Sequence, residues 1–434
     1  LRLIEHVITS DRPYSEIVTA DYTLADSTVA TVWGLPYDAK GELWQETKYA
    51  DGRPTAGILS DSFLFTRHGT TYSNKSRGRA NLVSRALLCY DFLSREIPID
   101  TGIDLADEGA VTHAVQENPA CLTCHQTLDP LAAYFAPFRP IYVPSDLKAY
   151  PYDTYVESLQ KPFSVTEPGF FGAPSKNLKE LGAAIAKDPR FSLCAAKRFY
   201  SYLAEVNVED VPHDLAARLQ SVLLDHDLSA KALARAIVLS DEFRSAYGKT
   251  EDAAEDLVGL MKTRPEALAR TVQDLTGYRW ETTLPFPIQG AVVGEVDLMS
   301  DAFFGFKVLA GGVDGQSVTR PSHTMSATTT LTFEALASHA SEHVVVNDFA
   351  NPKKEARRLL KLIDEKDTSE ANVRAQLAAL ELRFYGTDLA SDAPEVDDAY
   401  ELFTKTLAAH SGNALRAWTM VVYALLQDPR MAYY

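Results

Sequence analysis

The pentapeptide Cys121-Leu-Thr-Cys-His125 constrains the fold of this 434-residue chain more than any other feature. Two thiols about one helical turn apart can add to the two vinyl groups on one edge of a haem, and the adjacent imidazole then lies beneath the iron. The spacing therefore predicts one covalently bound haem c, attached through Cys121 and Cys124, with His125 as the proximal iron ligand. Covalent attachment keeps such a haem in place even where its pocket is partly open.

Two other kinds of site share the C-x-x-C pattern. A redox dithiol is typical of a thioredoxin-like fold, but no βαβ pattern surrounds the motif. Half of a zinc site is the other alternative, and it needs about two more thiolate or imidazole ligands with their own close spacing. Cys89 and Cys194 stand apart in the sequence, so they do not form such a pair.

The second axial ligand of the predicted haem stays open between three arrangements. His68, in the loop Arg67-His-Gly-Thr-Thr, gives bis-histidine iron. In a second arrangement, Met325 or His323 reaches the iron from the second half of the chain. In a third, the iron is five-coordinate or binds water at the second axial position. A small cytochrome c usually takes its methionine from the haem domain, but no methionine precedes residue 261; the methionines are Met261, Met299, Met325, Met420 and Met431.

A basic island surrounds Lys75-Ser-Arg-Gly-Arg in an otherwise acidic chain. Haem carries two propionates, which favour arginine partners through charge-assisted hydrogen bonds. Arg77 and Arg79 are therefore candidate propionate partners, although a solvated basic surface has the same composition. His339 and His343 have the i, i+4 spacing of a metal-binding pair, but no third ligand is evident, so a helix-surface pair is the simpler interpretation.

The remaining cysteines, Cys89 and Cys194, allow two interpretations. They form a disulfide if the protein resides in an oxidising compartment. Alternatively they are two buried thiols, because free cysteine is among the most buried residue types.

The hydrophobic periodicity predicts a mainly α fold. Caps and apolar spacing predict helices in many segments, among them one from Asn351-Pro352 through Ile363. Alternating patterns are few, and the best are near Thr282–Val293 and Gly305–Val318. We expect a helical haem-binding region over residues 1–250, resembling a cytochrome c module embedded in a larger helical body, and a second mainly helical domain over residues 251–434. A proline- and aromatic-rich loop is predicted over 137–174, and the boundary between the regions falls in the polar stretch Lys249–Glu255.

The net charge of −17 makes nucleic acid an unexpected partner, because both halves of the chain repel polyanions. No apolar run approaches the roughly 18 residues of a membrane-spanning helix. The chain starts at Leu1 rather than methionine and shows no secretory signal, so we expect a processed or truncated sequence.

The chain resembles the planctomycete-type cytochrome proteins, large secreted proteins in which a haem module lies among helical modules. The resemblance covers about residues 1–250, and its most specific part is the run Cys121-Leu-Thr-Cys-His-Gln-Thr-Leu-Asp-Pro-Leu. It implies a periplasmic or exported haem protein with Cys121, Cys124 and His125 as the attachment and ligand positions. Ala132 stands where the family usually has glycine, so the turn beyond the haem helix is expected to differ. Further matching segments begin at Asp11, Ala56, Ser76, Arg85, Asp188, Leu239 and, more weakly, Arg270.

The first functional hypothesis is electron transfer by Fe(III)/Fe(II) cycling, and the second is a haem enzyme, a peroxidase or oxidase, with an open distal face. A third is a subunit of a larger periplasmic redox assembly, because a helical body of about 250 residues exceeds what a carrier of one haem needs. Electron transfer is the favoured hypothesis, with a redox protein as the partner.

Overall fold

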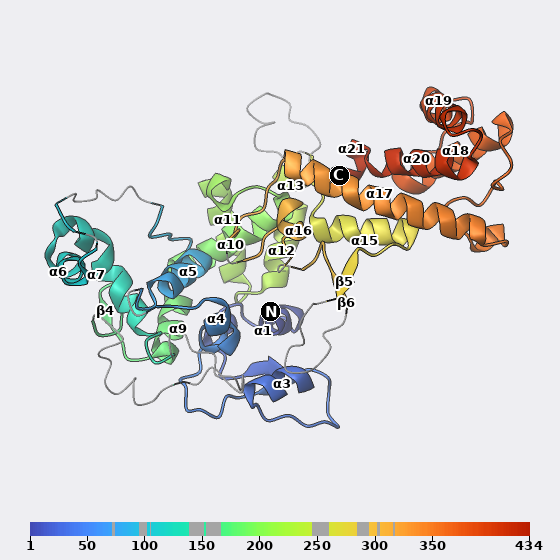
Figure 1. Ribbon diagram of the computed structural model, residues 1–434. Helices are drawn as coiled ribbons and strands as arrows, with labels where there is room; N and C mark the ends of the chain where they lie inside the picture. Colours follow the sequence, from blue (N-terminus) through green and yellow to red (C-terminus); the bar gives the residue numbers. More distant parts are fainter. Residues whose placement is uncertain are drawn as a thin grey trace. The chain divides into compact units, whose positions relative to one another are not determined.

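The computed structural model describes residues 1–71, 74–94, 102–104, 106–138, 152, 166–244, 260–283, 295–301, 304–315 and 317–434. The chain divides into two compact units, Leu1–Leu257 and Val258–Tyr434. Both are mainly helical, with only short two-stranded sheets in the described residues, which confirms the predicted fold class (Figure 1). The polar stretch Lys249–Glu255 lies outside the described residues, as does most of the proline-rich segment over 137–174.

The first unit is a set of helices with two small antiparallel hairpins. β1 (Thr23–Ala25) pairs with β2 (Gln45–Thr47), and β3 (Gly169–Phe170) pairs with β4 (Ala173–Pro174). The helices are α1 (Arg2–Thr9), α2 (Glu16–Thr19), α3 (Ser27–Trp33), α4 (Ser62–Arg67), α5 (Arg77–Leu88), α6 (Glu108–Glu117), α7 (Pro119–Ala133), α9 (Leu178–Lys187), α10 (Pro189–Ala204), α11 (His213–Asp225), α12 (Ala230–Leu239) and α13 (Asp241–Arg244), with 3-10 turns η1 (Gly57–Ser60) and η2 (Val208–Asp210).

Two glycines allow α9 and η1 to approach the backbone of α2 closely. A Cβ on Gly57 would lie 2.1 Å from the carbonyl oxygen of Ile17, and one on Gly182 would lie 2.0 Å from that of Val18. Gly57 also has a positive φ of 51°, which disfavours any residue with a side chain. This close packing goes with buried side chains on all three elements, among them Ile17, Leu59 and Leu181.

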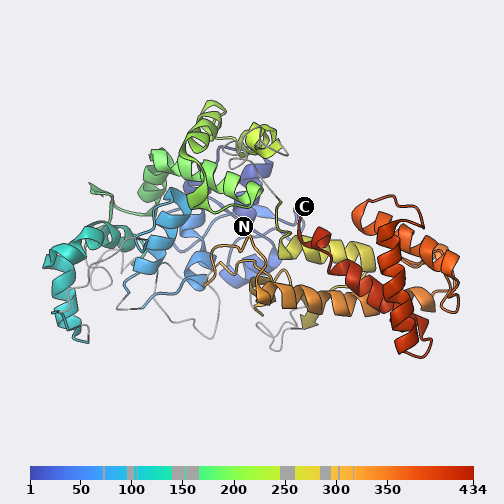
Figure 2. The ribbon, with the colours of Figure 1, turned by 90° about the horizontal axis from the view of Figure 1, so that it is seen from above.

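The motif helix α7 lies at one end of the first unit, where it packs against α5, α6 and β3 (Figures 1 and 2). Its carboxyl end is anchored by Phe135 and Phe138, which are buried and pack around the ring of Phe65. Gly169 of β3 permits close contact with the helix, because a Cβ there would lie 3.3 Å from the Cβ of Pro130. One end of α7 is therefore fixed in the core.

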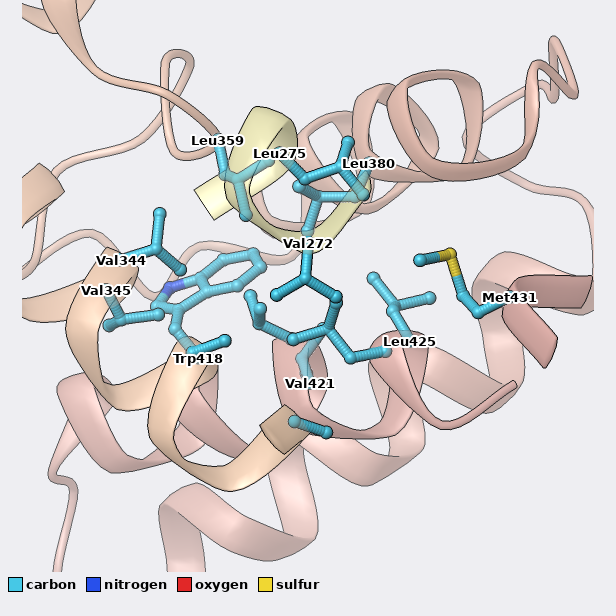
Figure 3. Close-up of a cluster of buried hydrophobic side chains, with 14 of the residues drawn as sticks. Val272, Leu275, Val344, Val345, Leu359, Leu380, Trp418, Val421, Leu425 and Met431 are labelled. Carbon is cyan, nitrogen blue, oxygen red and sulfur yellow. The ribbon is translucent and has the colours of Figure 1, made fainter. Parts of the chain in front are cut away.

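The second unit has a separate core around Trp418, which is fully buried (Figure 3). Val344 and Val345 lie beside the indole, and the ring centroid of Phe403 lies 4.8 Å from that of Trp418. The elements are α15 (Pro265–Thr276), α16 (Phe306–Leu309), α17 (Ala327–Ala350), α18 (Glu370–Tyr385), α19 (Pro394–Ala409), α20 (Ala414–Leu426), α21 (Pro429–Ala432), the 3-10 turn η3 (Lys354–Ala356) and the hairpin of β5 (Glu281–Thr283) with β6 (Glu295–Asp297).

The prediction of a helix from Asn351 to Ile363 is wrong. Apart from the turn η3, this segment is irregular, because side chains rather than helical carbonyls and amides satisfy its backbone. The buried carboxylate of Asp348 accepts hydrogen bonds from the amides of residues 358, 359 and 360. The guanidinium of Arg357 donates to the carbonyls of residues 351, 360 and 363. Three of the apolar residues that suggested a helix, Leu359, Leu360 and Ile363, are buried without one, whereas Leu362 is 53% exposed.

The strand pattern near Gly305–Val318 is also not realised in the described residues of that range. Gly305 has a φ of 82° and precedes the single helical turn α16. The hydroxyl of Thr329 donates a hydrogen bond of 3.2 Å to the carbonyl of Leu309 in that turn. Of the other pattern, near Thr282–Val293, only the start lies in the described chain, where β5 pairs with β6.

Candidate haem attachment site

Local sequence explains why the motif lies on a helix that starts just before it. Asn118 ends α6 and caps α7, since its side-chain oxygen accepts a hydrogen bond of 2.9 Å from the amide of Ala120. Pro119 occupies the first helical position, where its missing N–H costs nothing. The helix then continues through the motif to Ala133.

Helical periodicity places the chemistry of the motif on one face of α7. Cys121, Cys124, His125, Leu128 and Asp129 follow the i, i+3, i+4 spacing that brings side chains to one side. The two thiols are free and partly exposed, and Cys124 packs against the core of the first unit. Leu128 and Asp129 are buried, so this face leads from an accessible pair of sulfurs to a buried carboxylate.

The imidazole of His125 is held by Asp129. Its Nδ1 lies 3.0 Å from Oδ1 of Asp129, whose side chain is only 7% exposed. An ionised carboxylate only accepts hydrogen bonds, so Nδ1 carries the proton. In the neutral imidazole this tautomer leaves Nε2 with a lone pair, which is the form that binds a metal.

The same carboxylate is held from α5 by Arg77. Nε of Arg77 donates to Oδ1 of Asp129 at 2.6 Å, and Nη2 donates to Oδ2 at 3.0 Å. Burial raises the pKa of Asp129, but the hydrogen bonds from His125 and Arg77 lower it more, so the pKa lies below its ordinary value. Asp129 is therefore ionised at neutral pH, and both of its oxygens join α7 to Arg77 of α5.

Arg79 has a different environment from Arg77. Its side chain is buried, and it donates to the backbone carbonyls of His68, Phe138 and Phe65. The guanidinium thus ties the end of α4 and the end of the motif segment to α5. In the structure, Arg77 donates to the carboxylate of Asp129 and Arg79 donates to backbone carbonyls. A role for either arginine at haem propionates stays a prediction.

The candidate distal ligand His68 lies at the end of α4, in the same unit as the motif. Its side chain is half-buried. Burial lowers the pKa of His68, and the positive charges of Arg67, Arg79 and Arg85 lower it further. The imidazole is therefore neutral at pH 7, which is the form that binds a metal.

The other candidate ligands belong to the second unit. Met325 packs against the core of that unit, and His323 is half-buried nearby in the chain. His339 and His343 lie exposed on α17, where the ring of Tyr278 lies 6.2 and 5.5 Å from theirs. The participation of Met325 or His323 in an iron site stays a prediction.

Cys89 and Cys194 form a disulfide, with an S–S distance of 2.14 Å. Cys89 caps the carboxyl end of α5, and Cys194 lies in α10, so the bond joins two helices of the first unit. This pairing decides between the two interpretations of these cysteines. It also removes both sulfurs as zinc ligands, and the described part of the chain contains no group of three or more His, Cys, Asp or Glu side chains arranged for a metal ion.

The network of Asp129 with Arg77 was not predicted from the sequence. The sequence does contain a signal for the contact of Asp129 with His125. Asp129 follows His125 by four residues, and such a pair shares a helix face. Arg77 lies 52 residues earlier, and no local pattern indicates which carboxylate it meets.

None of the described helices has both the length and the apolar character needed to cross a membrane. The chain matches no protein-family model, no curated protein and no solved structure.

Proposed function

We propose that this protein is an exported mono-haem c-type cytochrome that transfers electrons, as part of a larger redox assembly. The observation that carries the proposal is the arrangement on α7. Two free, partly exposed thiols share a helix face with an imidazole whose Nδ1 is occupied by Asp129 and whose Nε2 is left for a metal. These donors fit the attachment sulfurs and the axial nitrogen that a haem c requires.

In this proposal the haem supplies reversible one-electron chemistry when it is bound. Cys121 and Cys124 hold it by thioether bonds, and His125 provides the proximal nitrogen. Asp129 and Arg77 fix the orientation of that nitrogen from the buried side of the helix. The resemblance to the planctomycete-type cytochromes supports the same assignment of the three motif residues.

Two further features support the proposed location and partners. A disulfide between Cys89 and Cys194 is typical of the periplasm and of exported proteins, where thiols are oxidised. The helical body around the motif is larger than one haem needs, which favours docking to other proteins. Size-exclusion chromatography of native material tests the assembly: we expect elution above the 47.8 kDa of the chain, and a clean monomer contradicts it.

A haem enzyme with an open distal face is the second candidate, and the hydrogen bond from His125 to Asp129 agrees with it as well as with a carrier. A carboxylate that accepts the Nδ1 hydrogen bond makes the imidazole a stronger donor to iron. Strong donation stabilises oxidised iron, which suits a catalyst as well as a carrier of low potential.

One visible spectrum separates these two functions. The protein is expressed with the c-type maturation machinery and measured oxidised and dithionite-reduced, with and without carbon monoxide. Electron transfer predicts six-coordinate, low-spin iron in both oxidation states and no rapid carbon monoxide binding. A high-spin fraction that binds carbon monoxide rapidly indicates the enzyme, and a colourless protein contradicts both proposals.

The distal ligand is tested by His68→Ala. If His68 binds the iron, this variant becomes high-spin and binds carbon monoxide rapidly. His226→Ala is the matched control, because His226 is an exposed histidine of the same unit. A His68→Ala spectrum identical to that of the wild type eliminates His68 as the ligand.

A further inference from the structure

We infer that Asp129 is a positioning residue for the iron site, and that Arg77 sets the strength with which it acts. This inference rests on the proposed haem function and goes beyond it, because it names the residues that determine the electron-donating strength of His125.

The geometry points to Asp129 because one oxygen serves two partners. Oδ1 lies 3.0 Å from Nδ1 of His125 and 2.6 Å from Nε of Arg77. A simple ion pair between α5 and α7 needs only the arginine and the carboxylate. The position of His125 against the same oxygen couples the imidazole to that ion pair.

Burial makes this coupling effective. The side chains of Asp129, Arg77 and His125 are 7%, 19% and 23% exposed, so water screens their interactions weakly. A charged acceptor for the Nδ1 proton gives the imidazole partial negative character, which favours Fe(III) over Fe(II). Arg77 withdraws part of that charge, so it opposes the effect of Asp129.

The chain contains a matched control for this pair one helix earlier. His113 and Glu117 of α6 have the same i, i+4 spacing, with 3.4 Å between Nδ1 and Oε1. Their side chains are 70% and 67% exposed. Glu117→Gln therefore removes the same charge from the same kind of pair, but from one that is exposed to solvent and lies outside the motif.

The test compares the midpoint potentials of the wild type, Asp129→Asn and Glu117→Gln, after intact mass has shown covalent haem in each. We expect Asp129→Asn to shift the Fe(III)/Fe(II) equilibrium at least tenfold toward Fe(II), which is a rise of about 59 mV for a one-electron couple. Glu117→Gln should change the equilibrium less than threefold. Equal shifts in the two variants overturn the inference.

A second variant covers the case in which Asp129→Asn does not fold. Arg77→Gln alters a partly exposed side chain and leaves the carboxylate to His125 alone, so we expect a shift of at least threefold toward Fe(III). In the Asp129→Asn background, when that variant folds, Arg77→Gln should lose most of this effect, because interacting residues are not additive. An unchanged potential in Arg77→Gln, or the same shift in both backgrounds, contradicts a role through Asp129.

The failure of the inference and the failure of the proposed function are distinct results. A wild-type protein without covalent haem removes the proposed function itself. Covalent haem in all variants with unchanged potentials leaves a cytochrome in which Asp129 and Arg77 only join two helices.

Discussion

At the scale of single residues, buried guanidinium groups organise the first unit. Arg53 is one, with its side chain fully buried. It donates to the carboxylate of Asp51, to the carbonyl of Ser60 and to the hydroxyl of Ser62. Arginine suits this task because its planar fork has five donors. Together with Arg77 and Arg79, it satisfies backbone and carboxylate oxygens that would otherwise be buried without partners.

The Asp51 pair gives a prediction on pH. Burial raises the pKa of Asp51, but hydrogen bonds from Arg53 and from the amide of Tyr152 lower it more, to below the ordinary value of 3.8. The stabilisation is therefore complete above that ordinary value and is lost as the pH falls through the lower folded pKa. We expect Asp51→Asn to reduce the free energy of unfolding by about 3 kcal/mol at pH 7.

Urea unfolding of both proteins from pH 7 downward measures this difference. The gap between wild type and Asp51→Asn should narrow once the pH drops below 3.8, the ordinary pKa of the carboxyl group. A gap that stays constant over the whole range shows that the charge of Asp51 contributes nothing to the stability of the fold.

At the scale of elements, the disulfide between Cys89 and Cys194 is a long-range covalent link within the first unit. It joins α5 to α10 across a sequence separation of 105 residues. The motif helix packs against α5, so the bond holds the helix that also carries Arg77 and Arg79. Closing so long a loop restricts the unfolded chain strongly.

Replacing both Cys89 and Cys194 by alanine should therefore destabilise the first unit by about 3 kcal/mol. The measurement is the urea midpoint of the Soret band, which follows only the unit that carries the proposed haem. Reduction of the wild type with dithiothreitol should reproduce the loss and leave the double variant unchanged. A midpoint that is the same in all these samples shows that the bond is absent or without effect.

The hydrophobic periodicity predicted the mainly helical class, because helix formation and helix caps depend largely on local chemistry. Gly277 ends α15 in the left-handed conformation, and Ser229 caps α12. The segment after Asn351 was mispredicted because Asp348 and Arg357 replace helical hydrogen bonds by long side-chain contacts. The link from Arg77 to Asp129 is also a side-chain contact between residues far apart in the sequence. Local sequence patterns therefore could not predict this part of the candidate site.

At the scale of the whole molecule, each of the two units has a main hydrophobic core of its own among the described residues. The core of the first unit draws on residues from Leu3 to Phe191, and the core of the second on residues from Leu268 to Ala432. Each unit has the size of a typical domain. The proposed haem belongs to the first unit, and no function is assigned to the second.

Separate cores predict that a core mutation affects one unfolding transition only. Trp418→Ala should cost the second unit about 4 kcal/mol and leave the Soret-monitored transition unchanged. Leu131→Ala is the matched change in the first unit, since Leu131 is 1% exposed, and it should lower the Soret midpoint. A Soret midpoint that falls equally in both variants means that the two units unfold together.

The intact mass of the purified protein tests the central claim most directly. After expression with the c-type maturation machinery and denaturation without reductant, the polypeptide should retain the mass of one haem, and a variant with Cys121→Ala and Cys124→Ala should lose it. A wild-type mass equal to that of the polypeptide alone contradicts the assignment of Cys121, Cys124 and His125 as a haem c site.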